Sequence, residues 1–109
     1  MNINICKDFS ETPGARYRNE GDFSGEQFRE ELLEPKFLEA KNNGEKIIIN
    51  LDGGYGYTPS FLEVAFGGLS RKYGSDYVLP VLEFESNDEP SLIDEVLGYI
   101  KQAKKEGTA

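Results

Sequence analysis

The sequence of 109 residues contains no histidine and a single cysteine, Cys6. Without histidine, the chain cannot form a Ser-His-Asp or Cys-His catalytic arrangement, or a zinc site made of histidine and cysteine. One cysteine excludes an internal disulfide, and we interpret Cys6 as a small core residue on the first strand. Only chemistry based on carboxylates or hydroxyls, or supplied by a partner, remains. These absences weaken a catalytic interpretation, and we expect no catalytic residue, no metal site and no cofactor.

Long apolar runs and positive charge are also scarce. No run approaches the roughly 18 apolar residues of a membrane span, and the N-terminus has no signal-peptide pattern, so we expect a cytoplasmic protein. The formal net charge is −8, from 20 acidic and 12 basic residues. This charge disfavours binding to nucleic acid or to an anionic membrane. The length predicts a single domain over residues 1–109, with a frayed tail from about residue 105.

Three β-type segments alternate with helical patterns. We predict strands over residues 2–9, 46–51 and 77–84, and helices that begin at Ser24, Thr58 and Pro90. The strand 46–51 should be central and buried on both faces, whereas Pro80 indicates an edge strand or a bulge. The loop 10–21 could hide a fourth strand. The alternation predicts an α/β fold with a largely parallel sheet of three to four strands and about three helices.

The first helical pattern carries two further expectations. Ser24 and Gln27 fit a capping box. In this motif the serine oxygen accepts the backbone N–H of Gln27, and the Gln27 side chain reaches back to the backbone N–H of Ser24. Pro35 should kink or break the helix, after which three apolar residues continue its buried face: Phe37, Leu38 and Ala40. The acids Glu30, Glu31 and Glu34 are interpreted as the solvated face of this helix.

A glycine-rich loop, residues 53–57, joins the central strand to the second helix. Together with Asp52 and Glu63 it could form a small nucleotide- or anion-binding site at the helix N-terminus. The phosphate-loop motif is absent, however, and Pro59 occupies a position where the dinucleotide fingerprint requires glycine or alanine. We favour a flexible turn at Gly53, Gly54 and Gly56 that exposes Tyr55 and Tyr57.

Hydroxyl and basic side chains are the other candidates for functional residues. Thr58 caps the second helix and Ser60 follows it, and a phosphate on either would lie at the positive end of a helix dipole. Arg16 and Arg18 could contact an anion or a partner carboxylate, although an ion pair within the chain is the simpler interpretation. Three acids are the candidate partners: Glu20, Asp22 and Asp52.

Two motifs, one within residues 13–29 and one within residues 60–69, together resemble the prokaryotic STAS-like domain family of unknown function. The resemblance covers about residues 13 to 84 and rests on the segments PGARY (13–17), EG (20–21), SGE-x-FR (24–29) and SFLE-x-AFGGL (60–69), with the strand at 47–52. It implies a small sandwich with a mixed, mostly parallel sheet and helices largely on one side. It also implies a regulatory, non-catalytic role like that of anti-sigma factor antagonists.

The resemblance further implies a partner and a switch. Anti-sigma factor antagonists dock on a histidine-kinase-like ATPase, which phosphorylates the first serine of an Asp-Ser-Ser-Gly turn. Aligned without gaps from Leu51, that turn falls on residues 58–61, and Pro59 occupies the acceptor position. A surviving switch would therefore use Ser60 or Thr58. We expect a protein-interaction module in prokaryotic signalling, with a homodimer formed by exposed aromatic residues as a further possibility.

Overall fold

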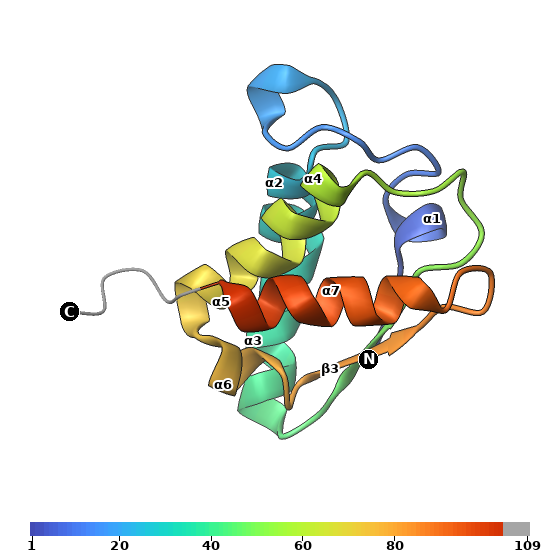
Figure 1. Cartoon of the computed structure of the whole chain (residues 1–109). Helices are drawn as coiled ribbons and strands as arrows, with labels where there is room; N and C mark the ends of the chain where they lie inside the picture. Colours follow the sequence, from blue (N-terminus) through green and yellow to red (C-terminus); the bar gives the residue numbers. More distant parts are fainter. Residues whose placement is uncertain (104–109) are drawn as a thin grey trace.

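A computed structural model describes residues 1–103. Its sheet has three parallel strands in the order β1-β2-β3, with β2 in the centre. The strands are β1 (Asn2–Asn4), β2 (Ile47–Asn50) and β3 (Leu82–Glu85). The structure thus confirms an α/β fold (Figure 1), and all of the strands in the described part of the chain are parallel rather than mixed.

Two long helices are composite, because each contains a π-helical turn. The first runs through α2 (Gly25–Phe28), η2 (Arg29–Leu33) and α3 (Glu34–Asn43). The second runs through α4 (Pro59–Leu62), η3 (Glu63–Gly67) and α5 (Gly68–Tyr73). The remaining helices are α1 (Ile5–Asp8), the short 3₁₀ helix η1 (Arg18–Glu20), α6 (Ser75–Val78) and α7 (Ser91–Gln102).

The strand register gives the sheet one buried and one polar face. Ile3, Ile47 and Ile49 are at most 1% exposed and belong to the single core cluster that contains the buried residues of the helices. The opposite face carries mainly asparagines and glutamates, which are exposed or half-buried: Asn2, Asn4, Ile48, Asn50, Glu83 and Glu85. Helices therefore cover one side of the sheet. The expectation that β2 is buried on both faces is wrong, because Ile48 and Asn50 are only half-buried.

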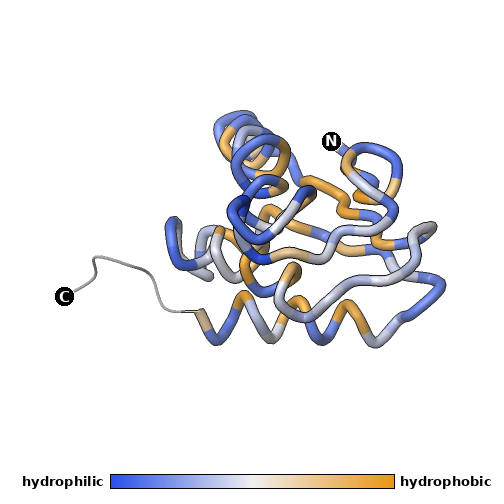
Figure 2. The backbone as a smooth tube through the Cα atoms, turned by 90° about the horizontal axis from the view of Figure 1, so that it is seen from above, coloured by the Kyte–Doolittle hydropathy of each residue, from blue (hydrophilic) through white to orange (hydrophobic). Residues whose placement is uncertain are grey.

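The core face of the second composite helix has the apolar residues that repeat at helical spacing in the sequence. Phe61, Leu62, Ala65, Phe66 and Leu69 are all fully buried. The last helix, which leads to the grey trace in Figure 2, alternates hydrophobic and hydrophilic residues once per turn. It packs on η3 and buries three side chains in the same core: Leu92, Val96 and Ile100.

Two predicted strands are shorter than expected. The first ends at Asn4, whose side chain accepts a hydrogen bond from the backbone N–H of Lys7 and starts α1, so Cys6 lies on a helix and is half-buried. The last begins only at Leu82, because residues 75–78 form a helical turn instead. It does lie at the sheet edge, as Pro80 indicated. The loop 10–21 contains no strand, and the predicted frayed tail lies outside the described residues.

The first composite helix corrects three expectations. No break occurs at Pro35, because the preceding turn is π-helical and the N–H of Glu34 reaches back to the carbonyl of Arg29. The Ser24 hydroxyl accepts the Gln27 N–H, but the Gln27 side chain donates to Glu31 rather than closing a capping box. Leu38 is 42% exposed and does not join the core. Gly44, at φ 68°, ends the helix.

Candidate functional site

A surface hollow of about 450 Å³ lies beyond the carboxyl end of β2. Its walls are the glycine loop, the loop after β3 and the start of α7, and its floor includes Leu51 and Leu92, which are 3% and 7% exposed. In open α/β sheets, binding sites form at this end of the strands. The hollow therefore brings the sequence-predicted loop to the place where parallel sheets most often bind ligands or partners.

Asp52 joins the glycine loop to the loop after β3. Its carboxylate accepts hydrogen bonds from the backbone N–H groups of Asn87 (2.7 Å) and Asp88 (2.8 Å), and from the Asn87 side chain (3.0 Å). The backbone bond from Asp88 is the main cause that holds the pKa of Asp52 below its usual value; burial opposes it, and the two bonds from Asn87 add to the lowering. All of the described hydrogen bonds of the Asp52 carboxylate come from the loop after β3, so this side chain positions two loops.

The two loop tyrosines have different environments. The Tyr57 hydroxyl donates to the Leu51 carbonyl (2.9 Å), and its ring stacks on Phe61 at 6.1 Å between centroids. Burial raises the Tyr57 pKa above its ordinary value. Tyr55 is 85% exposed. The expectation that both tyrosines are exposed is therefore wrong for Tyr57, which anchors the loop, and correct for Tyr55, which the loop presents.

The glycine loop is held in place rather than being a loose turn. Gly53 and Gly56 have φ angles of 100° and 110°, a region that side chains disfavour. Gly54 packs on loop 10–21, where a Cβ would lie 3.0 Å from the Glu11 carbonyl oxygen, and Tyr55 N–H donates to that same oxygen (3.0 Å). These contacts fix the backbone that carries Tyr55.

The two candidate hydroxyls also differ. Thr58 Oγ1 accepts the Phe61 N–H (3.1 Å) and donates to the Gly14 carbonyl (2.8 Å), which ties loop 10–21 to the start of α4. Pro59 follows as the first helical residue, where its missing N–H costs no helical hydrogen bond. Ser60 is exposed, and its hydroxyl makes no hydrogen bond within the described chain. Thr58 is also exposed, so what distinguishes Ser60 is a hydroxyl that no described group already binds.

Glu63 does not line the hollow. Its two carboxylate oxygens accept from the two terminal nitrogens of Arg71, at 2.7 and 3.0 Å. A Cβ on Gly67 would lie 2.5 Å from Glu63 Oε2, so this glycine leaves room for the ion pair beside the helix. The grouping of Glu63 with Asp52 and the glycine loop is consequently not found in the structure.

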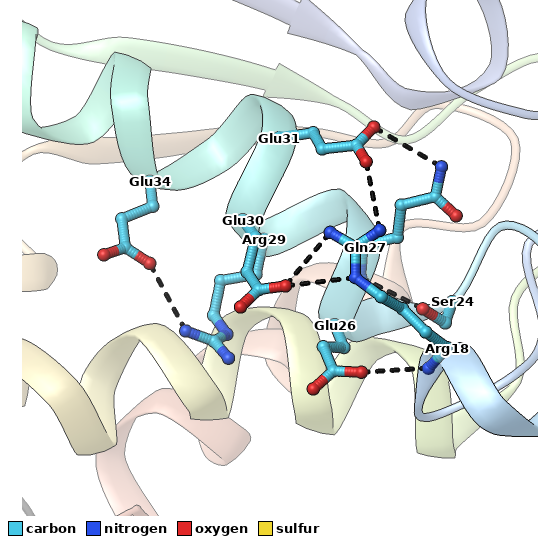
Figure 3. A network of polar contacts seen from close by, with 8 residues as sticks. All are labelled: Arg18, Ser24, Glu26, Gln27, Arg29, Glu30, Glu31 and Glu34. Carbon is cyan, nitrogen blue, oxygen red and sulfur yellow. Dashed lines mark hydrogen bonds and ion pairs between the residues drawn. The ribbon is translucent and has the colours of Figure 1, made fainter.

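Arg16 and Arg18 form ion pairs within the chain. Arg16 pairs with Glu20 at 3.1 Å, one of the partners that the sequence suggested. Arg18 instead reaches Glu30 and Glu31, at 3.0 and 3.1 Å, and so ties η1 to the first composite helix (Figure 3). These ion pairs hold the two arginines away from the hollow, among whose lining residues neither occurs.

The acids of the first composite helix are not merely solvated. Glu30 and Glu31 bind Arg18, and Glu34, whose side chain is 13% exposed, pairs with Arg29 at 3.3 Å (Figure 3) and with Lys72. The Tyr73 hydroxyl also donates to Glu34, at 2.6 Å. Burial favours the neutral acid, but the hydrogen bonds from Lys72 and Tyr73 outweigh it and leave the Glu34 pKa below its usual value. Glu34 therefore links the two composite helices.

The electrostatics of the hollow oppose an anionic ligand. Asp88 and Glu89 line it, and none of its lining residues is a lysine or an arginine. Pro59 also removes one of the backbone donors that a phosphate at the helix N-terminus would need. Sequence reasoning identified the glycine loop as part of the site but did not identify Asp88, Glu89 and Leu92 as lining residues. The sequence after a strand does not show which other loop it will face in the fold.

Within residues 1–103, no cluster of three or more acidic or cysteine side chains is arranged to hold a metal ion. In the same part of the chain, no helix combines the length and the apolar character that crossing a membrane requires.

Comparison with family models gives one match. Residues 24–92 match the STAS-like domain of unknown function (DUF4325), which covers more than half of the chain. Searches among curated proteins and among solved structures give no match. The chain belongs to this STAS-like family, as the sequence motifs suggested. The matched residues include the glycine loop, Asp52, Ser60, Asp88 and Glu89.

Proposed function

We propose that this STAS-like domain is a non-catalytic interaction module in prokaryotic signalling, which docks on a histidine-kinase-like ATPase through its glycine-loop corner. By the glycine-loop corner we mean residues 53–57 together with the first turn of α4. The observation that carries the proposal is the exposure of Tyr55, at 85%, on a loop whose backbone is fixed on both sides. Aromatic residues held in this way are frequent anchors of protein interfaces.

Preorganisation supports the choice of this surface. Asp52 fixes the loop on one side, Thr58 fixes loop 10–21 beside it, and Tyr57 anchors it to the core. A partner that binds Tyr55 would therefore pay little conformational entropy to order the loop. Exposed aromatic side chains elsewhere, such as Tyr17 at 46% and Tyr77 at 54%, leave homodimerisation as an alternative use of the surface.

The proposed switch residue is Ser60. The Thr58 hydroxyl makes two hydrogen bonds that hold the corner together, so modification there would break both. Ser60 is exposed in the first turn of the composite helix, where a phosphate would meet the positive end of the dipole. Added negative charge in the first turn of α4 would change partner binding without unfolding the corner.

A small nucleotide- or anion-binding domain is the competing hypothesis. The acidic lining of the hollow and the lack of a Pro59 N–H both weigh against it. Calorimetric titration with ATP, GTP and cyclic nucleotides in the presence of magnesium distinguishes the two proposals. Saturable micromolar binding would favour the nucleotide site over the interaction module.

The direct test is a pull-down with a histidine-kinase-like ATPase encoded next to this chain. Wild type should recover the ATPase, whereas Tyr55→Ala and Ser60→Glu should recover less. Tyr77→Ala is a matched control, because it removes an exposed tyrosine of the helical turn α6, outside the glycine-loop corner. Equal recovery by wild type and Tyr55→Ala would contradict the proposed surface.

A further inference from the structure

The hollow beside Tyr55 has an unusual combination of walls. Its floor is apolar, formed in part by Leu51 and Leu92, and one wall is the bare backbone of the glycine loop. On the other wall stand the exposed carboxylates of Asp88 and Glu89. Tyr55 completes the lining, with most of its ring open to solvent.

The two carboxylates differ in how much of their bonding capacity the chain already uses. Asp88 Oδ2 accepts the Gly53 N–H at 3.1 Å, which fixes the side chain beside the glycine loop. The Glu89 backbone carbonyl accepts the Ser86 hydroxyl at 2.6 Å, which fixes that residue's backbone. No described lysine or arginine pairs with Asp88 or Glu89. The six ion pairs of the described chain involve five other acids, and most of the remaining acids are also without an ion pair; Asp88 and Glu89 differ from those in lining this hollow together.

We infer that this hollow receives an arginine side chain from a basic segment of the protein partner, an inference that rests on the proposed function and specifies the chemistry of the contact. A guanidinium can bind two carboxylates with its fixed donors and can also lie on an aromatic face. Its methylene stem would cover the apolar floor. A lysine offers the charge and the stem but not the planar donor fork.

The open backbone of the glycine loop is part of the same site. Gly56 has no heavy atom within 4 Å of the position of a Cβ, so its missing side chain leaves space rather than relieving a clash. The volume of about 450 Å³ exceeds what one side chain fills, so flanking residues of the partner segment have room beside Tyr55. The net charge of −8 would also steer a basic segment toward this protein.

The test is an NMR titration of the full isotope-labelled chain with three capped pentapeptides of sequence Gly-X-Gly-X-Gly, where X is arginine, citrulline or lysine. The arginine peptide should shift the amide resonances of residues 53–57 and 86–92, and this effect should weaken with added salt. Citrulline retains the shape but not the charge, so its peptide should shift them little. The lysine peptide should bind more weakly than the arginine peptide.

Charge-removing variants locate the contact. Asp88→Asn/Glu89→Gln preserves shape and leaves an oxygen to accept the Gly53 N–H, and it should weaken binding of the arginine peptide about fivefold or more. Glu39→Gln/Glu45→Gln removes the same charge from exposed positions near the opposite end of β2 and should change the affinity less than about twofold. Glu89→Lys serves as a second variant, because the Glu89 side chain has no described partner whose loss could unfold the chain.

Several results would overturn the inference. They are equal binding of the citrulline or lysine peptide, shifts centred outside residues 53–57 and 86–92, and equal weakening by the control pair. If the arginine peptide binds as expected but the ATPase does not, the inference stands and the proposed function fails. If the ATPase binds Asp88→Asn/Glu89→Gln as tightly as wild type but loses affinity for Tyr55→Ala, the proposed function stands and the inference fails.

Discussion

The backbone N–H of Asp88 donates to the carboxylate of Asp52 at 2.8 Å, across 36 residues of sequence. The bond is matched by one in the other direction, from the Gly53 N–H to the Asp88 carboxylate at 3.1 Å. Together they hold the ends of two adjacent parallel strands and their loops in one arrangement. The hollow beside Tyr55 exists because these two loops are held together.

The first prediction concerns this link. Asp52→Asn removes the charge that strengthens three hydrogen bonds, so we expect a melting temperature several degrees below that of wild type. Because the Asp52 pKa is lowered in the folded state, its contribution is present above the unfolded-state pKa and is lost as pH falls through the folded-state pKa. The difference between the proteins should therefore disappear in acid.

Differential scanning fluorimetry from neutral pH to about pH 3 measures this effect. Asp22→Asn is the control, since Asp22 is exposed and makes no hydrogen bond or ion pair among the described residues. Equal melting temperatures of Asp52→Asn and Asp22→Asn at neutral pH would show that the loop link contributes nothing.

A second prediction concerns Glu34, the half-buried carboxylate between the composite helices. Glu34→Gln leaves Arg29 without its anionic partner and weakens the bonds from Lys72 and Tyr73, so we expect a loss of about 1–3 kcal/mol in the free energy of unfolding. The folded-state pKa of Glu34 is lowered, so the loss should be greatest near neutral pH and shrink below about pH 4. Urea denaturation at several pH values measures it. A loss that grows in acid would contradict the assignment.

The third prediction compares two helical glycines. A Cβ on Gly25 would lie 2.7 Å from the Phe61 carbonyl oxygen, so Gly25→Ala should cost about 1–3 kcal/mol by forcing α2 and α4 apart. Gly98, in the middle of α7, has nothing within 4 Å of its Cβ position, so Gly98→Ala should stabilise the protein by about 0.5–1 kcal/mol. Urea denaturation of both variants gives the comparison. Destabilisation of similar size in both would refute the close approach of α2 and α4.

The sequence predicted the helices better than the strand lengths. Apolar residues at helical spacing identified the buried face of the second composite helix, since periodicity reports directly which side meets the core. The alternation Ile3, Ile5 was typical of a strand, but Asn4 caps a helical turn and ends β1. A local hydrogen bond from a side chain to the backbone can end a strand, and the spacing of hydrophobic residues does not reveal such a bond.

The candidate site was predicted in part for a similar reason. Strand, glycine loop and helix start were visible in the sequence, and the exposure of Tyr55 followed from them. The burial of Tyr57 did not, because it depends on a hydrogen bond to Leu51 and on stacking against Phe61. The partners of Arg18 were also hidden, since 12 and 13 residues separate it from Glu30 and Glu31. Long-range ion pairs leave no periodic trace.

A fourth prediction separates the two hydroxyls of the corner. Ser60→Glu places negative charge in the first turn of the composite helix, so it should leave stability unchanged or raise it by about 0.3–1 kcal/mol while it lowers affinity for the ATPase. Thr58→Val removes the cap and the bond to Gly14, so it should cost about 1–2 kcal/mol. Thermal unfolding with calorimetric titration of the ATPase measures both properties. Loss of stability in Ser60→Glu would argue against a switch at this position.

The most direct test of the docking surface is hydrogen exchange of the full chain with and without the histidine-kinase-like ATPase. The account predicts slower exchange on binding at residues 53–57 and 86–92, and little change on the polar face of the sheet or along α3. Tyr55→Ala should lose this protection while it retains the exchange pattern of the free wild type. Protection confined to the polar sheet face, with residues 53–57 unaffected, would contradict the account.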